Sequence, residues 1–221
     1  MAATLALIGG AEWTDGCTFD AALLDRSGTG RVVVVPTAAA YEDPDGVVER
    51  AVTWFAGHGA ETEVIEVYRR ADATGAAIAP LADASFVYLA GGSPMHLRSV
   101  LKDSDLWVAI VGVWRRGGVL AASGEAASVL STSMVDSRGG AFTVGLDLLG
   151  SLTVIPRHNL WSADKLHRTV QLAPSAMTVA GIDEATALIW DGSSWSTGGV
   201  GRVSVYRNGH LEAIGTVPPP E

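Results

Sequence analysis

Cysteine is nearly absent from the sequence, which contains one among 221 residues, Cys17. A single cysteine excludes an internal disulfide framework and a cysteine-rich zinc site. The histidines and carboxylates also lack metal-ligand spacing such as His-Glu-x-x-His. We therefore predict no metal site and no cofactor.

Positive charge is scarce as well. The chain has 15 Lys and Arg against 24 Asp and Glu, which gives a formal net charge of -9. Its largest basic clusters are pairs such as Arg69-Arg70. This balance argues against a nucleic-acid partner. No apolar run approaches the ~20 residues of a membrane span, and the first ten residues lack the positive charge of a signal peptide. We expect a cytoplasmic protein without a membrane partner, and leave homodimer formation open.

Hydrophobic residues are what the chain has in quantity. They make up 48% of it, whereas charged residues are 18%, against roughly 25% in an average soluble domain. This composition excludes intrinsic disorder and provides one sizeable core. We predict a single domain over residues 1–217 and a frayed tail at 218–221, which contains three consecutive prolines.

Short apolar runs alternate with helical patterns over the first 133 residues. Predicted strands cover 5–8, 31–36, 61–68, 85–89 and 118–122, and predicted helices cover 19–24, 43–56, 94–101, 106–116 and 126–133. The run Arg31–Pro36 is nearly all valine, as expected for a strand buried on both faces. This rhythm predicts an α/β fold of three layers, a doubly wound and mainly parallel sheet flanked by helices.

The last third of the chain has a different pattern. Short predicted strands at 153–155, 177–182, 185–190 and 202–207 are joined by turns such as Asp191-Gly192 and Asn208-Gly209. These dipeptides favour hairpins. We therefore predict antiparallel strands near the C-terminus, as an extension at one edge of the sheet.

Three segments follow predicted strands where ligands bind in open α/β sheets, at the strands' carboxyl ends. They are Gly9-Gly10, residues 91–94 (Gly-Gly-Ser-Pro) and residues 122–126. Paired glycines let backbone N–H groups approach a ligand or an oxyanion, although they also simply end strands. Neither glycine pair belongs to a phosphate-binding loop motif.

The third segment has the layout of a nucleophile elbow, a strand that turns tightly into a helix. The residues two before and two after the nucleophile must be small. Centring the elbow on Gly124 places alanines at both flanks, whereas centring it on Ser123 places Glu125 at one of them. The pattern favours Gly124 at the centre, and glycine has no side chain that can attack a substrate.

Four motifs together resemble a known family. Residues 91–94 lie where the family has a Gly-Gly-Asn-Gln turn, and residues 122–127 (Ala-Ser-Gly-Glu-Ala-Ala) lie where it has a Gly-Thr-Ser-Ala-Gly-Ala elbow. Residues 145–149 begin a glycine-leucine segment that leads to His158, as in the family. Residues 181–187 reproduce the family's Gly-Ile-Asp-Glu-x-Thr-Ala. On these motifs the chain resembles the serine peptidase family of dipeptidase E and cyanophycinase, which has a class I glutamine amidotransferase-like fold. The resemblance covers most of the chain.

The resemblance implies a serine mechanism in which an elbow serine attacks, a histidine is the base and an acidic residue orients it. In this chain the serine position falls on Gly124, the base on His158, and the oxyanion donors on the amides of Gly92 and Glu125. Asp136 is the nearest acidic residue after the elbow helix. The resemblance further places Gly91, Ser93 and Pro94 at the binding site for a small peptide or amino-acid-like ligand. Arg157 and Arg168, on either side of His158 in the chain, are candidates for the local positive charge that an acidic ligand requires.

Two functions follow from these residues. The first is a degenerate relative that lacks the nucleophile and is non-catalytic or altered in activity. The second is an active serine hydrolase of small acidic, aspartyl peptides, in which the turn shifts by one residue so that Ser123 is the nucleophile and His158 the base.

Overall fold

A seven-stranded sheet forms the centre of the computed structural model, which describes residues 2–221. Its strands are β1 (Thr4–Ile8), β2 (Arg31–Val35), β3 (Glu61–Val64), β4 (Phe86–Leu89), β5 (Val119–Ser123), β10 (Thr186–Trp190) and β11 (Trp195–Gly199). Their order is β11-β10-β1-β5-β4-β2-β3. The five strands β1, β5, β4, β2 and β3 are parallel to one another. Strand β10 pairs antiparallel with β1, and β11 pairs antiparallel with β10.

The sheet buries both of its faces, and successive side chains alternate between them. In β2, Val33 and Val35 belong to one hydrophobic core, whereas Val32 and Val34 belong to a second core on the opposite face. All four valines are fully buried. The valine run is therefore explained by its central position, as the sequence predicts for a parallel strand.

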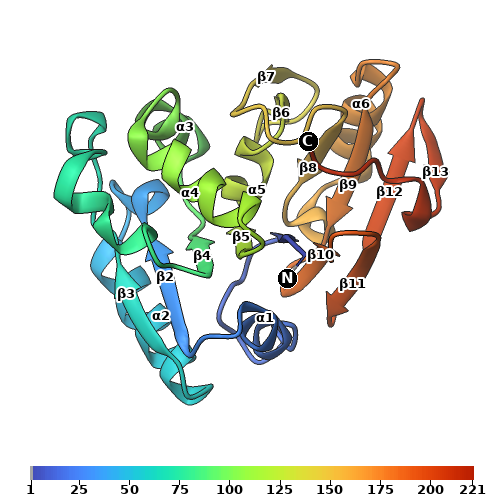
Figure 1. Ribbon diagram of the computed structural model, residues 1–221. Coiled ribbons are helices and arrows are strands. Elements are labelled where there is room, and N and C mark those ends of the chain that lie inside the picture. Colours follow the sequence, from blue (N-terminus) through green and yellow to red (C-terminus); the bar gives the residue numbers. More distant parts are fainter. Residues whose placement is uncertain (1) are drawn as a thin grey trace.

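Helices cover both faces of the sheet (Figure 1). Helices α1 (Asp20–Ser27) and α2 (Pro44–Gly57) contribute Leu23, Phe55 and neighbouring side chains to one core. Helices α3 (Pro94–Leu101), α4 (Asp105–Arg115) and α5 (Glu125–Val129) pack into the other core. The predicted three-layer, mainly parallel α/β fold is confirmed.

Most strands of the C-terminal third form a second sheet. In Figure 1 this sheet lies on the opposite side of the molecule from β2 and β3. It contains β8 (Leu152–Ile155), β9 (Thr178–Ile182), β12 (Val203–Arg207) and β13 (His210–Glu212), in the order β13-β12-β9-β8. Antiparallel strands near the C-terminus are confirmed. Only β10 and β11, however, extend the main sheet, so the prediction of a single edge extension is wrong for the rest.

Smaller elements complete the chain, and the sequence analysis missed several of them. They are α6 (Ala163–Leu172), the pair β6 (Ser133–Val135) and β7 (Phe142–Val144), and short 3-10 turns at Thr37–Ala39, Arg70–Asp72, Gly75–Leu81, His158–Leu160 and Ile214–Thr216. Helix α6 had a detectable start signal, because the Ser162 side chain accepts a hydrogen bond from the Lys165 amide.

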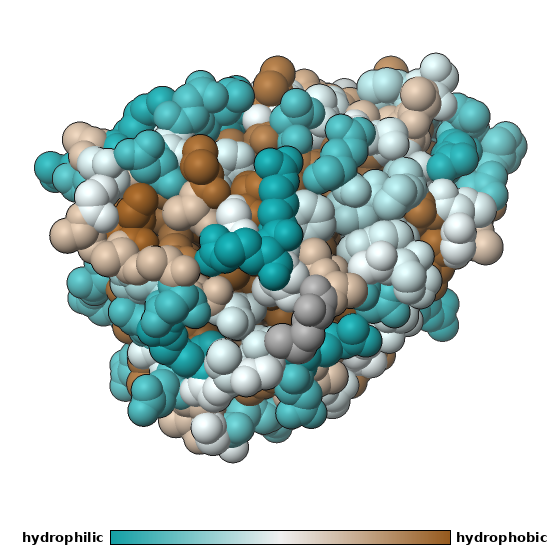
Figure 2. Space-filling model, in the orientation of Figure 1, coloured by the Kyte–Doolittle hydropathy of each residue, from teal (hydrophilic) through white to brown (hydrophobic). Residues whose placement is uncertain are grey.

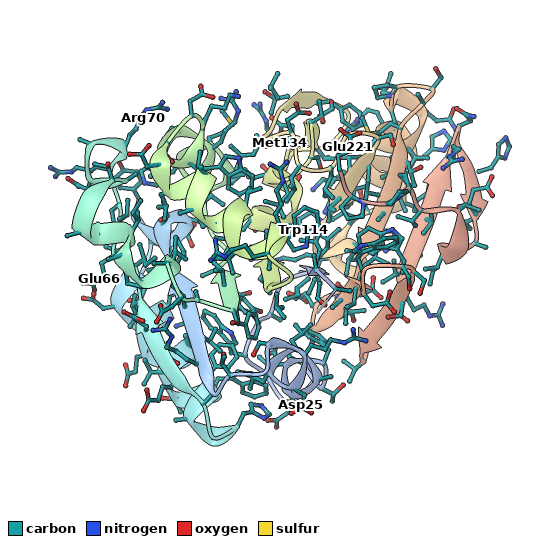
Figure 3. All side chains as sticks on the ribbon, in the orientation of Figure 1. Asp25, Glu66, Arg70, Trp114, Met134 and Glu221 are labelled. Atoms are coloured by element: carbon teal, nitrogen blue, oxygen red, sulfur yellow. The ribbon has the colours of Figure 1, made fainter. Side chains whose placement is uncertain are left out.

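The C-terminal residues are held against the domain, contrary to the predicted frayed tail. Trp195 Nε1 donates to the Pro218 carbonyl at 2.9 Å, and the Glu221 amide donates to the Leu148 carbonyl at 3.3 Å. Figure 3 labels Glu221 at this position. A backbone bonded at both ends of the segment is ordered even where its prolines provide no N–H donor.

The surface shown in Figure 2 intersperses hydrophobic and hydrophilic side chains. Within residues 2–221, no helix combines the length and apolar character needed to span a bilayer.

Candidate functional site

The predicted elbow is a tight turn that leads from β5 into α5 and is centred on Gly124. Gly124 has φ +56° and ψ -130°, a conformation that side chains rarely adopt and that a strained strand-to-helix turn requires. Its amide donates to the Ile8 carbonyl at 2.9 Å, which ties the elbow to the end of β1. A Cβ placed on Gly124 would come no closer than 3.9 Å to Arg157, Gly10 or Gly91. The elbow thus has room for a side chain and carries none.

Ser123 points away from the elbow opening. Because side chains alternate along a strand, Ser123 faces the same side of β5 as Val119 and Ala121, toward the layer of α1 and α2. The residue is fully buried, and its Oγ donates to Glu12 Oε2 at 2.7 Å. The structure does not bring Ser123 Oγ to His158.

Glu12 links the strands around the elbow. Its Oε1 accepts from the Gly91 amide at 2.9 Å while its Oε2 holds Ser123. One carboxylate from the segment after β1 therefore fixes the ends of β4 and β5. Sequence reasoning missed Glu12, although its place two residues after Gly9-Gly10 puts it at the carboxyl end of β1.

His158 has a protein partner at each ring nitrogen. Its Nδ1 lies 3.1 Å from Asp183 Oδ1 and its Nε2 lies 3.2 Å from the Tyr206 hydroxyl. With Asp183 ionised, Nδ1–H donates to the carboxylate and Nε2 accepts from the tyrosine. Neither nitrogen is left to accept a proton at the elbow.

The acidic partner of His158 is thus Asp183, in contrast to the prediction of Asp136. Asp136 is engaged by Arg138, whose Nε donates to Asp136 Oδ1 at 3.0 Å. Asp136 and Arg138 are two residues apart in the turn between β6 and β7, so their contact is local. Asp183 also accepts from the Arg202 amide at 3.0 Å, so it joins β9 to the loop before β12.

The predicted oxyanion donors flank the elbow. Gly92 has φ +143°, and a Cβ there would lie 2.5 Å from the Ala38 carbonyl, so the turn requires glycine. Among residues 2–221, neither the Gly92 amide nor the Glu125 amide donates to a protein acceptor. Both N–H groups therefore remain open to hydrogen bonding.

Arg157 lies over the elbow. Its Nη2 is 3.9 Å from the position of a Cβ on Gly124, and its Nη1 donates to Glu125 Oε1 at 3.1 Å. The backbone of Arg157 is left-handed, with φ +49°, and its amide donates to the Gly9 carbonyl at 2.7 Å. An ion pair in this partly buried setting fixes the guanidinium at the centre of the site.

Two pockets meet at Arg157 and Leu160, which line both. The first has a volume of about 450 Å³ and is lined by Ala11, Glu12, Glu42, Val47, Arg50, Gly91, Gly92, Arg157, Leu160 and Glu184. The second has a volume of about 250 Å³ and lies along α5. We call the two together the cleft, and the second the α5 pocket.

The cleft contains part of the predicted ligand-binding set. Of that set Gly91, Pro94 and Arg157 line it, as do the predicted oxyanion donors Gly92 and Glu125. The other two predicted residues do not: Ser93 caps α3, its Oγ accepting from the His96 amide, and Arg168 is an exposed residue of α6 that packs against Gly140. The largest pocket, about 630 Å³ beside α2, contains none of the predicted residues.

Comparison with known proteins decides the family. The model of peptidase family S51 matches residues 5–197. The chain belongs to peptidase family S51. A search of curated proteins finds no match. Among solved structures, a peptidase from an acI-B1 Actinobacterium is similar with a TM-score of 0.85 and 26% identity, over 96% of this chain and 93% of that one.

A second solved structure supports the same fold for this S51 chain. A putative peptidase E protein from Listeria monocytogenes EGD-e has a TM-score of 0.64 at 16% identity, over 91% of this chain and 100% of that one. The predicted relation to the dipeptidase E family is confirmed.

A buried carboxyl lies in the layer beneath the elbow of this S51 chain. Asp20 is fully buried, and burial raises the pKa of its carboxyl to about 7, with a smaller contribution from the nearby Glu12 charge. Trp54 Nε1 donates to Asp20 Oδ2 at 2.9 Å and opposes this rise, whereas Oδ1 has no protein partner. Within residues 2–221, three or more His, Cys, Asp or Glu side chains nowhere gather as a set that could hold a metal.

Proposed function

We propose that the chain is a member of the dipeptidase E family that lacks serine-dependent hydrolysis and binds a small peptide or amino-acid-like ligand in the cleft. One observation carries the proposal. Gly124 provides no attacking atom at the elbow, and the neighbouring Ser123 hydroxyl is buried against Glu12 rather than directed at His158.

The surroundings of His158 support the same proposal. A general base must reach the proton that it removes, at about 2.6–3.2 Å. Tyr206 already occupies Nε2 of His158, and Asp183 occupies Nδ1. These contacts are those of a structural histidine whose hydrogen bonds are all made within the fold.

Arg157 supports the proposal that the cleft binds a ligand. Its guanidinium lies in the cleft between the two pockets, with 43% of its side chain exposed. A guanidinium held by one carboxylate keeps further N–H donors for a second anionic group. We therefore place the carboxylate of a peptide or amino acid at Arg157.

The alternative function, an active hydrolase of small aspartyl peptides, rests on Ser123. Its Oγ does donate to a carboxylate, Glu12, which is a group able to accept a proton. For attack, however, Ser123 has to leave a fully buried position and cross to the opposite face of β5.

Hydrolysis of aspartyl and glutamyl dipeptides by the wild-type protein, Gly124→Ser and Ser123→Ala tests these alternatives. We expect no turnover by any of the three. Gly124→Ser stays inactive because Arg157, not an imidazole, faces the new side chain. Wild-type turnover that disappears in Ser123→Ala would establish the alternative. Turnover gained by Gly124→Ser would show that only the attacking atom is missing.

Binding of the same dipeptides is measured in parallel by isothermal titration calorimetry. Arg157→Gln is expected to weaken binding about tenfold or more, because it removes a charged hydrogen bond to the ligand. Arg168→Gln is the matched control, since Arg168 is an exposed arginine outside the cleft. Equal affinities of the two variants would contradict the assignment of the cleft.

A further inference from the structure

The α5 pocket is lined by both polar and apolar residues and is of a size for a single ligand group. It is lined by Pro94, Glu125, Ser128, Val135, Ser137, Pro156, Arg157, Leu160, Trp161 and Lys165. Its volume of about 250 Å³ is below the ~300–1,000 Å³ of sites for drug-sized ligands. One amino-acid side chain is therefore a suitable occupant, and a longer peptide has to continue outside it.

Within the described residues 2–221, two polar atoms of the pocket residues are buried without a protein partner. They are Glu125 Oε2 and Ser128 Oγ, which lie three residues apart and hence on one face of α5. Ser128 is only 2% exposed, so it forms the inner part of the pocket. Leaving a buried acceptor or hydroxyl unpaired destabilises the site, and a ligand with matching groups removes that cost.

The inner part of the pocket is electrically balanced. The Glu125 carboxylate is already paired with the Arg157 guanidinium at 3.1 Å, and Ser128 is neutral. A charged ligand group buried beside them adds an unbalanced charge, which is costly away from water. A neutral group that donates one hydrogen bond and accepts another is therefore favoured over an ammonium or a carboxylate.

A free cation lies farther out. Lys165 Nζ is 3.7 Å from the centre of the Trp161 ring, and within residues 2–221 it has no carboxylate oxygen within salt-bridge distance. Burial lowers the pKa of Lys165, although Asp136 and Glu125 favour its charged form. This ammonium can pair with an anionic group of a ligand whose neutral end is inside.

We propose that the α5 pocket recognises a primary carboxamide, the side-chain amide of a glutamine or asparagine ligand. The amide N–H donates to Glu125 Oε2, the amide oxygen accepts from the Ser128 hydroxyl, and the ligand carboxylate lies between Arg157 and Lys165, which both line this pocket. This inference rests on the proposed binding function, because it places one end of the ligand in the same cleft. It adds a selectivity for amides over the isosteric acids.

The test compares N-acetyl-L-glutamine with N-acetyl-L-glutamate, and the asparagine with the aspartate derivative, by calorimetry on the full chain. We expect the amide of at least one pair to bind about tenfold more tightly than its acid, as one lost hydrogen bond and one buried charge imply. Free glutamine and a glutamine dipeptide then distinguish a free amino acid from a peptide residue as the source of the amide.

Variants connect the selectivity to the two unpaired atoms. Ser128→Ala should weaken amide binding about tenfold, because the amide oxygen loses its hydroxyl donor, and the exposed Ser137→Ala, also at the pocket, serves as its control. Glu125→Gln releases Arg157 from its ion pair and should shift the preference toward the acid. Thermal unfolding of each variant confirms that it is folded.

Equal affinities of amide and acid, a preference for the acid in the wild type, or no binding of either compound would overturn the carboxamide proposal. So would a Ser128→Ala variant with unchanged amide affinity. These results leave the proposed function standing as long as dipeptides still bind in an Arg157-dependent way. Loss of that dependence, or wild-type turnover, contradicts the proposed function instead.

Discussion

The elbow and the histidine cluster differ in how their polar groups are paired. At the elbow, Glu125 Oε2 and Ser128 Oγ are buried without protein partners. In the histidine cluster, both ring nitrogens of His158 are bonded, to Asp183 and Tyr206. Within residues 2–221, the elbow therefore retains buried polar groups without a partner, whereas the histidine cluster uses its polar groups for contacts within the fold.

Under the proposed function, this difference means that the backbone of the elbow is kept although the side chains of a serine mechanism are not brought together there. The elbow conformation depends on main-chain hydrogen bonds and close packing of small residues, such as the bond from the Gly124 amide to Ile8. A serine mechanism needs in addition two side chains within hydrogen-bond reach. Such a geometry is lost when either residue is replaced or acquires another partner.

The largest expected effect comes from comparing how much the stability of the fold depends on Gly92 and on Gly124. Gly92→Ala should lower the free energy of unfolding by about 4 kcal/mol or more, because its Cβ would lie 2.5 Å from backbone atoms of Ala38. Gly124→Ala should cost only about 1–2 kcal/mol, from its positive φ alone. Urea unfolding measures both, and equal losses would contradict the open space at Gly124.

The buried carboxyl beneath the elbow gives an intermediate, pH-dependent effect. The pKa of Asp20 is about 7 in the folded protein, above its ordinary value of 3.8, because of burial. The folded state thus disfavours ionisation, so this contribution to stability is complete below about pH 4 and is lost as pH rises through 7. Its full size is about 4 kcal/mol at most, from the two pKa values.

Asp20→Asn checks this sign. The amide keeps an oxygen for Trp54 Nε1 and cannot ionise. Relative to the wild type, the variant should gain about 2 kcal/mol or more at pH 8 and nothing comparable at pH 4. Urea unfolding at the two pH values measures the difference, and a gain that is the same at both would show that Asp20 is not the titrating group.

The smallest effect separates the two acidic candidates for His158. In a double-mutant cycle of unfolding free energies, His158→Ala and Asp183→Ala should be coupled by about 1–2 kcal/mol, because the side chains are bonded at 3.1 Å. Asp136→Ala should be coupled to His158→Ala by less than about 0.5 kcal/mol, as for separate sites. The reverse order of couplings would restore Asp136 as the partner.

Much of the fold was predictable because it depends on local pattern. The valine run of β2 and the turns Asp191-Gly192 and Asn208-Gly209 predicted a buried strand and two hairpins, and the structure has them. The small residues beside Gly124 predicted the centre of the elbow. Strand β3 ends at Val64, earlier than predicted, and the second sheet was not foreseen, since pairing depends on partners far away in sequence.

The site was predictable only in part, for the same reason. Chain order made Asp136 the nearest acid after the elbow helix, yet Asp183 is the one that contacts His158. Strand alternation contains the signal that Ser123 faces the α1 and α2 layer, because Val119 and Ala121 do so. No sequence pattern indicated that Glu12 would join Ser123 to Gly91 across three strands.

The sequence by itself determined the family, the layered α/β architecture and the absence of a side chain at the centre of the elbow. Those properties follow from motifs, from hydrophobic periodicity and from the identity of Gly124, all of which are local. Only the tertiary structure decided which acid meets His158, that Arg157 lies over the elbow, and that Glu125 and Ser128 share a pocket. Hydrogen bonds and burial act over a few ångströms in space, and distance along the chain does not specify which groups come that close.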